Sequence, residues 1–467
     1  MKTQRFFLLL VLVSLLLLPP AFRPALAEQS APDFSALEKV ALDELKQTNT
    51  PGAAVAIVSG DRVIFAKGFG TSNIETGAPV LPEMLFRIGS TTKMFTAAAL
   101  LTLVEEGKLK LDEPVGKYVK GLHPKVAQVT AHQLLTHTAG IKDDAVMLGL
   151  HDDQALGENV RSWKEDFCFT EPGKIFSYSN PGYWLAGFVL EEVTGKPYAD
   201  QMAERLFKPL GMKSTTLRPT MAMTFPLSQG HEATGQAQPT VVRPMADNVG
   251  NWPAGSIFTN VYDLAQFTIA LMNEGKGDGK QVLPPSLVTK LSTPYANVPG
   301  SESKYAYGLM IDRQRGVRLV QHNGSRSGYG SIIRMAPEHR FAVIALTNRT
   351  GVSLGQTANK AMELMLPLEA RAEAKPRQEI EMSAAEAAKY AGVYVNGSTR
   401  IELMVKDGKL FNKQGTNDRP VVKIGENRFA IVLANSRQEF VVVTGAAGQA
   451  EFLHGGGRSL KRIQAQQ

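Results

Sequence analysis

Two regions far apart in the chain carry the spacing of apolar residues that is typical of β-strands. Near the start, Ala53–Ser59 and Arg62–Phe69 predict two strands joined by the hairpin signal Gly60-Asp61. Three later stretches are rich in β-branched and apolar residues: Val317–His322, Tyr329–Met335 and Phe341–Thr347. From Ser90 to Val193, apolar residues instead recur at helical spacing. We therefore expect an α/β fold of the α+β type, in which distant parts of the chain close one sheet.

A second unit is predicted at the C-terminal end. Pro367–Arg377 is rich in Ala, Glu, Lys and Pro, a composition typical of a linker. Short apolar runs separated by Gly and Asn follow at near-regular spacing and predict a small antiparallel barrel or sandwich. These runs are Tyr390–Tyr394, Ile401–Val405, Lys409–Phe411, Phe429–Val432 and Phe440–Val443. We expect a main domain over residues 28–370, a linker over 371–380 and a β-barrel-like domain over 381–467.

The first residues have the composition of an export signal. Lys2 and Arg5 precede the apolar run Phe6–Leu18, and Ala25-Leu26-Ala27 has the small-residue pattern of a signal-peptidase site. The run is short for a permanent membrane anchor, although an uncleaved anchor is the alternative. We predict that Met1–Ala27 is a cleaved signal peptide. The mature protein is then expected to be periplasmic or secreted, with no stable membrane anchor.

Charge and cysteine content exclude several classes of function. Removal of residues 1–27 takes away three basic and no acidic residues, which lowers the formal net charge from +7 to +4. No block of Lys and Arg forms a basic stripe, so we expect no nucleic-acid partner. Cys168 is the only cysteine and cannot form an intramolecular disulfide, so stability must come from the core. The eight histidines are scattered without a His-Glu-x-x-His motif, and we expect neither a metal nor another cofactor.

One serine stands at the start of a helical pattern that is apolar almost all round. The pattern runs from Ser90 to Glu106, and Gly107 follows it as a stop signal. Lys93 lies three residues on and therefore faces the same side as Ser90. The apolar surroundings imply burial, which disfavours the charged form of a lysine and lets it accept a proton. Ser90 and Lys93 are thus a candidate nucleophile and base, the alternative being a helix-capping serine beside a solvated lysine.

Two further segments carry groups that such a nucleophile would use. Tyr178 and Asn180 precede Pro181-Gly182 and another helical pattern. A tyrosine can shuttle a proton, and an asparagine side chain can both donate to and accept from a substrate amide. Gln321-His322-Asn323-Gly324-Ser325 ends a predicted strand, where Gly324 permits the close approach of a substrate backbone.

In this order, the segments resemble the three motifs of class C β-lactamases and the related DD-peptidases. The matching residues are Ser90-x-x-Lys93, Tyr178-Ser179-Asn180 and His322-x-Gly324. Similar supporting phrases accompany them: Gln133–Gly140, Pro253–Ser256 and Gly324–Gly330. The resemblance extends over residues 32–366, and the tail is similar to the small β-domain often appended to such enzymes.

The resemblance implies a fold and a role for each residue. The implied fold is the β-lactamase/penicillin-binding fold, a five-stranded antiparallel sheet with helices on both faces and a helical subdomain. Ser90 is expected to be acylated while Lys93 and Tyr178 move its proton. Asn180 is expected to orient the substrate amide, and the backbone N–H groups of Ser90 and Ser325 to form the oxyanion hole.

His322 departs from the Lys-Thr/Ser-Gly motif that β-lactamases of this kind usually carry. A histidine is largely neutral at pH 7, so it binds a substrate carboxylate less strongly than a lysine does. In this respect the chain is similar to DD-carboxypeptidase-like, D-aminopeptidase-like and esterase-like relatives. Residues 322, 324 and 326 share one face of an extended strand, and Arg326 is a candidate for the positive charge that His322 lacks. A solvated arginine at a strand end is the alternative.

The predicted activity is hydrolysis through an acyl-enzyme on Ser90. The expected substrates are small molecules or peptides, among them D-amino-acid peptides derived from peptidoglycan and simple esters, with weak if any β-lactam hydrolysis. We expect residues 28–370 to carry out the acylation without the tail. The sequence leaves the physiological substrate and the oligomeric state open.

Two other functions compete with this one. Gly351-Val352-Ser353-Leu354-Gly355 lies between a predicted strand and a helix, the context of an α/β-hydrolase nucleophile elbow. Asp407, Asp418 and His454 follow it as the remaining members of such a triad, but in an all-β pattern. The third possibility is a catalytically silent peptidoglycan- or peptide-binding protein on the same fold.

Overall fold

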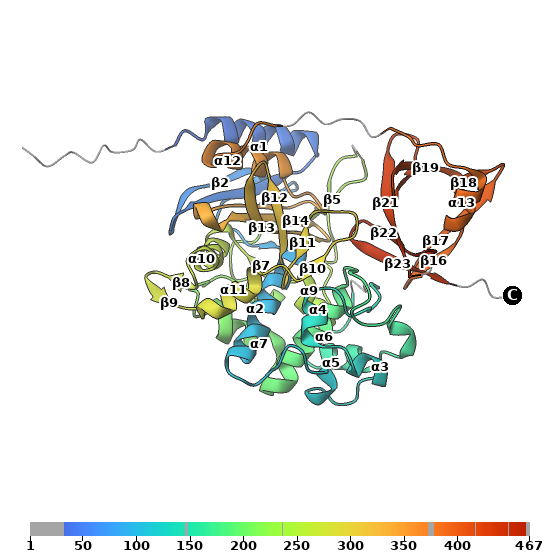
Figure 1. Ribbon diagram of the computed structural model, residues 1–467. Coiled ribbons are helices and arrows are strands. Elements are labelled where there is room, and N and C mark those ends of the chain that lie inside the picture. Colours follow the sequence, from blue (N-terminus) through green and yellow to red (C-terminus); the bar gives the residue numbers. More distant parts are fainter. Residues whose placement is uncertain are drawn as a thin grey trace, which may run out of the picture.

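The computed structural model describes residues 32–463 except 145–147, 236, 372–377, 416 and 447. The expected signal peptide, Met1–Ala27, lies outside the described residues. Figure 1 shows a large domain of helices around a sheet and, beside it, a smaller all-β unit formed by the last part of the chain. The expected fold class is confirmed.

One antiparallel sheet forms the centre of the large domain. Its strand order, β10-β11-β12-β13-β14-β15-β1-β2-β3, brings the two ends of the domain together. Ala56 of β1 pairs with Ile344 of β15, so the expected closure by distant parts of the chain is confirmed. The strands are β1 (Gly52–Ser59), β2 (Arg62–Asn73), β3 (Ala78–Pro79), β10 (Ala296–Asn297), β11 (Lys304–Tyr305), β12 (Met310–Gln314), β13 (Val317–Arg326), β14 (Tyr329–Ala336) and β15 (Phe341–Thr347).

The sheet is wider than the five strands that the resemblance implied. β13, β14, β15, β1 and β2 are its long strands, and short strands extend both edges. β15 is buried along its whole length and β1 along all but its last residue. Both strands are almost entirely apolar because helices cover both faces of the sheet there.

Helices pack in two layers. On one face α1 (Ser35–Gln47) lies beside α12 (Gly355–Met365), and their apolar sides share a cluster with β1 and β15 (Figure 1). On the other face α2 (Thr92–Glu105) and α10 (Val261–Met272) pack through Phe95 and Phe267, whose rings are 4.0 Å apart. The helical subdomain contains α6 (Asn180–Thr194), α3 (Pro124–Ala127), α4 (Ala131–Leu135), α5 (Ala155–Arg161), α7 (Tyr198–Met202) and α9 (Trp252–Gly255). α11 (Pro285–Ser292) packs on α2, and α8 (Pro219–Ala222) packs through Ala222 with Leu85 and Phe258.

The all-β unit is a closed barrel, in which β16 pairs with both β17 and β23. The expected strand at Tyr390–Tyr394 begins only at Gly392, because Ala384–Tyr390 forms helix α13. Its N-cap is Ser383, whose side chain accepts from Glu386 N. The strands are β16 (Gly392–Asn396), β17 (Thr399–Lys406), β18 (Lys409–Asn412), β19 (Arg419–Gly425), β20 (Arg428–Val432), β21 (Arg437–Thr444), β22 (Ala450–Gly455) and β23 (Arg458–Ile463).

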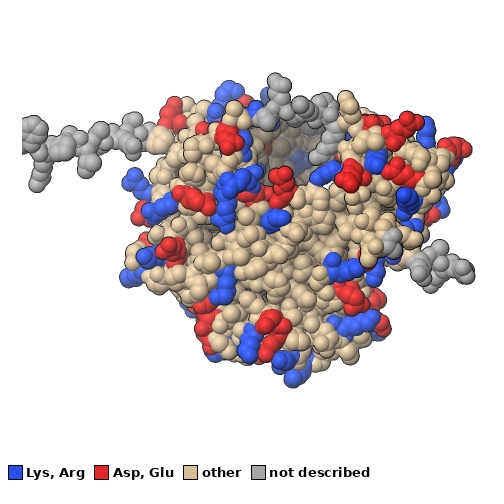
Figure 2. All heavy atoms as spheres, in the orientation of Figure 1, with Lys and Arg blue, Asp and Glu red and all other residues tan. Residues whose placement is uncertain are grey.

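The visible surface carries charges of both signs. In Figure 2, Lys and Arg are interspersed with Asp and Glu around a broad uncharged centre, and no basic stripe crosses this face. None of the helices in the described part of the chain is long and apolar enough to span a membrane.

Candidate active site

Ser90 lies at a tight turn that leads into the buried helix α2. Gly89–Thr91 forms a 3₁₀ turn, η1, directly before α2, so the expected helix begins with this turn. Gly89 has a φ of +51°, and a Cβ there would lie 2.5 Å from Ser325 N. Only glycine therefore allows the backbone before Ser90 to approach the end of β13 so closely.

Lys93 is fully buried in the first turn of α2. Its Nζ lies 3.2 Å from Ser90 Oγ, 2.7 Å from Asn180 Oδ1 and 2.8 Å from Ala254 O. Burial holds the pKa of Lys93 well below its usual range, although the carboxylate of Asp143 acts in the opposite direction. The site thus favours a free amine next to the Ser90 hydroxyl.

Tyr178 packs against the same lysine. Lys93 Nζ is 4.7 Å from the centre of the Tyr178 ring, and Tyr178 lines the same two cavities as Ser90. Burial raises the pKa of Tyr178 above its usual value. The ring centres of Tyr178 and His137 are 4.2 Å apart, and Ser179 N donates to His137 Nδ1 at 3.1 Å. His137 therefore holds the segment that carries Tyr178.

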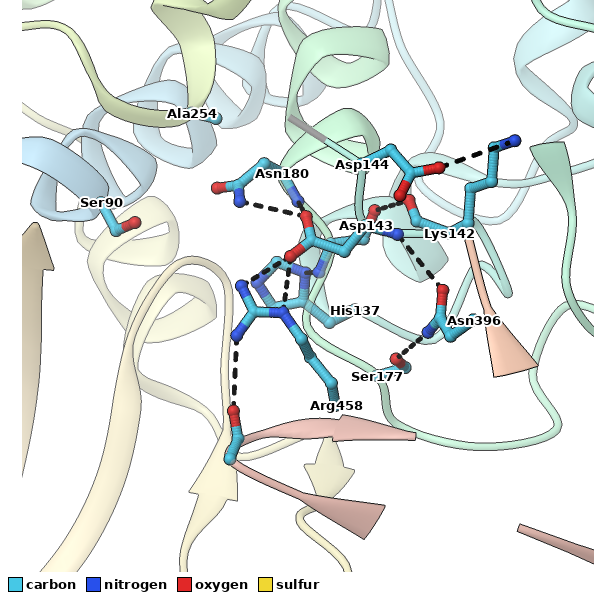
Figure 3. A network of polar contacts seen from close by, with 12 residues as sticks. Ser90, His137, Lys142, Asp143, Asp144, Ser177, Asn180, Ala254, Asn396 and Arg458 are labelled. Atoms are coloured by element: carbon cyan, nitrogen blue, oxygen red, sulfur yellow. Dashed lines mark hydrogen bonds and ion pairs between the residues drawn. The ribbon is translucent and has the colours of Figure 1, made fainter. Parts of the chain in front are cut away.

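Asn180 begins α6 and is oriented by a carboxylate that the sequence did not single out. Its backbone N and its Nδ2 both donate to Asp143 Oδ1, at 2.7 and 3.0 Å (Figure 3). Because Nδ2 is engaged there, Oδ1 faces Lys93. The preceding residue, Ser179, caps α6 by accepting from Gly182 N at 3.1 Å.

His322 lies on β13, beside the same cavity. Its Nδ1 is 2.5 Å from Asn323 O, a group that can only accept, so Nδ1 carries the proton. Its Nε2 then accepts from the Tyr305 hydroxyl at 3.1 Å. Burial, reinforced by Lys93, lowers the pKa of His322 to about 3, so the ring is neutral at pH 7.

Gly324 and Ser325 lie where β13 passes the η1 turn. A Cβ on Gly324 would be 1.9 Å from Ile88 O, so the close approach at this glycine is made by the protein's own backbone. We had expected the missing side chain of Gly324 to make room for a substrate backbone. The space is instead occupied by the backbone just before the η1 turn, which packs against the sheet there. Ser325 is exposed and borders the same cavity as Ser90.

Arg326 is buried and not solvated. Its Nη2 donates to Ala246 O at 3.4 Å, and its Nε has no partner among the described residues. Arg87 also donates to Ala246 O and lies 3.2 Å from the carboxylate of Asp247. Burial, together with the charge of Arg87, lowers the pKa of Arg326 to about 9. The two guanidinium groups create an excess of positive charge beside the site.

Two adjoining cavities border Ser90, Tyr178, Ser325 and Arg458. The larger, of about 570 Å³, is lined further by His322, Gly324 and Ser353. The smaller, of about 200 Å³, is lined by Asn180, Trp184, Asn251, Ala254, Gly255 and Arg326. The structure therefore brings the sequence-selected residues around one serine, but His322 and Arg326 face different cavities.

Arg458 enters the site from the barrel, and nothing in the sequence pointed to it. It lies at the start of β23 and contacts Asp143 Oδ2 through Nε at 2.6 Å and Nη2 at 2.5 Å (Figure 3). Its only local signal is the run Gly455-Gly456-Gly457 before it, which predicts a tight turn but names no partner.

Ser353 does not stand at a nucleophile elbow. It follows β15, whose neighbours β1 and β14 are both antiparallel to it. A nucleophile elbow is instead found in α/β-hydrolases, whose sheet is mostly parallel. His454 lies where the barrel meets the large domain: its ring centre is 6.0 Å from that of Phe176, and its Nδ1 is 2.8 Å from Ser459 Oγ. The α/β-hydrolase interpretation is therefore wrong. In the described part of the chain, no three His, Cys, Asp or Glu side chains gather in a way that could hold a metal ion.

Residues 34–365 match the Beta-lactamase family. The chain belongs to this family. Among curated proteins, it is 28% identical over 317 residues to the protein flp of Staphylococcus aureus strain MW2, a match that covers 65% of this chain. The chain spans about 61% of the length of that relative.

Solved structures agree on the fold. The octameric penicillin-binding protein homologue from Pyrococcus abyssi is 26% identical, with a TM-score of 0.66, and the match covers 92% of this chain and 99% of that one. The D-amino acid amidase from Ochrobactrum anthropi SV3 is 25% identical, with a TM-score of 0.58, over 70% of this chain and 97% of its own.

Proposed function

We propose that this protein is an exported serine hydrolase that forms an acyl-enzyme on Ser90. The observation that carries the proposal is the set of contacts around Lys93. Two of its partners, Asn180 Oδ1 and Ala254 O, can only accept hydrogen bonds. A neutral amine has two N–H donors, which these oxygens take, and one lone pair. The lone pair then faces the hydroxyl of Ser90 at 3.2 Å.

The arrangement supports a path for one proton. Lys93 accepts the proton of Ser90 as Ser90 Oγ attacks the substrate carbonyl. Tyr178, whose raised pKa keeps its hydroxyl protonated, passes its proton to the leaving group and takes the proton that Lys93 holds. The backbone N–H groups of Ser90 and Ser325 are our proposed oxyanion hole, and the close contact of Gly89 with Ser325 supports their proximity. Water then releases the acyl group by the reverse path.

The proposed substrates are amides of D-amino-acid peptides and simple esters. The likeness to a D-amino acid amidase supports amide chemistry. The neutral state of His322 argues against tight binding of a β-lactam carboxylate at that position, so we propose weak β-lactamase activity at most. The positive charge of Arg326 instead favours an anionic group in the smaller cavity.

A serine-directed fluorophosphonate tests the nucleophile. After digestion with trypsin, we expect the adduct on the peptide Ile88–Lys93 and not on Thr350–Lys360, which carries Ser353. A protein that binds substrate but cannot be labelled would instead be the silent binding protein. Parallel assays with p-nitrophenyl esters, nitrocefin and a D-Ala-D-Ala peptide then rank the substrate classes.

Export is a separate part of the proposal and rests on the first residues of the sequence. Protein recovered outside the cytoplasm is expected to begin near Glu28. Mass spectrometry that finds Met1–Ala27 on the mature protein would show that the segment is not a cleaved signal.

A further inference from the structure

The hairpin between β22 and β23 of the barrel lies directly against the segment that carries Tyr178. Gly456 and Gly457 have φ values of +57° and +79°, which allow a two-residue turn. At this turn Gly457 O accepts from Tyr178 N at 2.9 Å. Two residues further on, Ser459 N donates to Ser177 Oγ at 3.1 Å. The backbone of Tyr178 and the side chain of the residue before it are thus bonded to the barrel.

A chain of side-chain contacts continues from this hairpin to the lysine beside Ser90. Arg458 holds Asp143 Oδ2, and Asp143 Oδ1 accepts from both nitrogens of Asn180 (Figure 3). The remaining polar atom of the Asn180 amide, Oδ1, contacts Lys93. The side chain of Asp143 is only 7% exposed, so without Arg458 its charge would be buried and largely uncompensated.

We propose that Arg458 is a positioning residue of the Ser90 site: by pairing with Asp143, it fixes the orientation of the Asn180 amide and sets the charge that Lys93 experiences. The inference rests on the proposed function, because it assumes that Lys93 is the base for Ser90. It replaces the expectation that residues 28–370 suffice for acylation, since a chain ending there lacks both Arg458 and the Gly457 carbonyl.

The charges around Lys93 determine the direction in which its pKa shifts when one of them is removed. The carboxylate of Asp143 raises the pKa of Lys93, whereas Arg458 and Arg326 lower it. The other titratable groups that face Lys93 keep their neutral forms at pH 7: Tyr178, Tyr183, His137 and His322. Loss of Arg458 must therefore raise the pKa of Lys93, and loss of the Asp143 charge must lower it.

A purely structural role for Arg458 makes a different prediction. Other contacts also join the barrel to the large domain, among them Asn396 Nδ2 to Ser177 Oγ at 3.2 Å and Ser398 N to Asp144 Oδ1 at 2.9 Å. If Arg458 only strengthened this interface, its loss would lower the labelling rate at every pH without moving the pH profile.

The experiment measures the second-order rate of Ser90 phosphonylation against pH, in the full mature chain. The variants are Arg458→Gln, Arg458→Lys and Asp143→Asn. The matched control is Arg428→Gln, because Arg428 is a barrel arginine that contacts the large domain at Gly300 O and is not among the charges that act on Lys93. Thermal unfolding of each variant shows that it is folded.

Labelling of Ser90 requires the deprotonated form of Lys93, so the acidic limb of the plot of rate against pH follows the pKa of Lys93. For Arg458→Gln we expect the acidic limb to move to higher pH by about 0.5 pH unit or more. This is the size of shift that one charge several ångströms away causes in a partly buried site. Asp143→Asn should move the limb down, while Arg458→Lys and Arg428→Gln should stay with the wild type.

The outcomes separate this inference from the function on which it rests. If the wild type is not labelled at Ser90, the proposed function fails and the inference fails with it. If the wild type is labelled but Arg458→Gln and Asp143→Asn keep its acidic limb, or move it in the same direction, Arg458 does not position the site and only the inference is overturned.

Discussion

Two serines, Ser90 and Ser353, line the same cavity, yet their surroundings differ in every respect that matters for catalysis. Ser90 precedes a buried helix and has a lysine one turn on. Ser353 lies in an irregular segment before α12, where the residue three positions on is Gln356. Ser353 also carries the more familiar sequence motif, Gly-x-Ser-x-Gly. Ser90 is therefore our proposed nucleophile because of the lysine buried beside it, whereas a motif without its strand and helix context indicates little.

The largest effect should come from Ser90→Ala. We expect turnover of an ester substrate to fall by a factor on the order of 10⁴–10⁶, as is common when a covalent nucleophile is removed. The measurement is kcat, with circular dichroism as the check on folding. Wild-type turnover in this variant would point to Ser353 as the nucleophile and overturn the proposed mechanism.

Lys93→Met tests the lysine that distinguishes the two serines. Methionine keeps an unbranched chain in the buried position, so folding should survive while proton transfer is lost. General-base catalysis typically contributes a factor of about 10²–10⁴, and we expect kcat to fall by that amount with KM nearly unchanged. A rise in KM at constant kcat would instead show that Lys93 binds substrate and is not the base.

Arg326→Gln tests whether the cavity beside Ser90 binds the carboxylate of a substrate. Because a hydrogen bond to a charged group contributes about 1.5–3 kcal/mol, we expect KM for a carboxylate-bearing substrate to rise by about tenfold or more. KM for a neutral ester should hardly change. Equal behaviour of the two substrates would show that the buried charge of Arg326 serves the structure alone.

Ser353→Ala should have the smallest effect. Ser353 borders the cavity without a base beside it, so its loss should change kcat/KM by less than about twofold, within the range of an uninvolved side chain. A loss above about tenfold would mean that Ser353 contacts the substrate or takes part in the reaction.

Local patterns predicted much of the fold. The apolar runs located β1, β2, β13, β14 and β15 and their closure into one sheet. In the barrel, the strand expected at Tyr390–Tyr394 overlooked helix α13, although Ser383 and Glu386 have the spacing of a capping box. β19, β22 and β23 were not predicted. In β22, Phe452, Leu453 and His454 are all buried in succession, so the strand lacks a simple alternation of buried and exposed residues.

The site residues likewise fall into those that the local sequence predicts and those that it does not. Ser90 and Lys93 were predictable because three residues along one helix fix their geometry. Asp143 and Arg458 are 315 residues apart in sequence, and their pairing depends on how the barrel sits against the large domain. No local pattern carries that information. The burial of Arg326 escaped prediction for the same reason, since Ala246 and Asp247 come from a distant loop.

The pairing of β1 with β15 has a consequence for how the chain folds. Gly52 N donates to Asn348 Oδ1 across 296 residues, and the seven residue pairs from Ala53 to Ser59 all join the beginning of the domain to its end. Contacts of such sequence separation form late and slowly, because a long loop must close before they contribute. The central strand β1 therefore lacks one of its two neighbours until the chain has been made as far as residue 347. Until then its unpaired apolar edge is a hazard for aggregation, and a holding chaperone that shields β1 would be of most use in that interval.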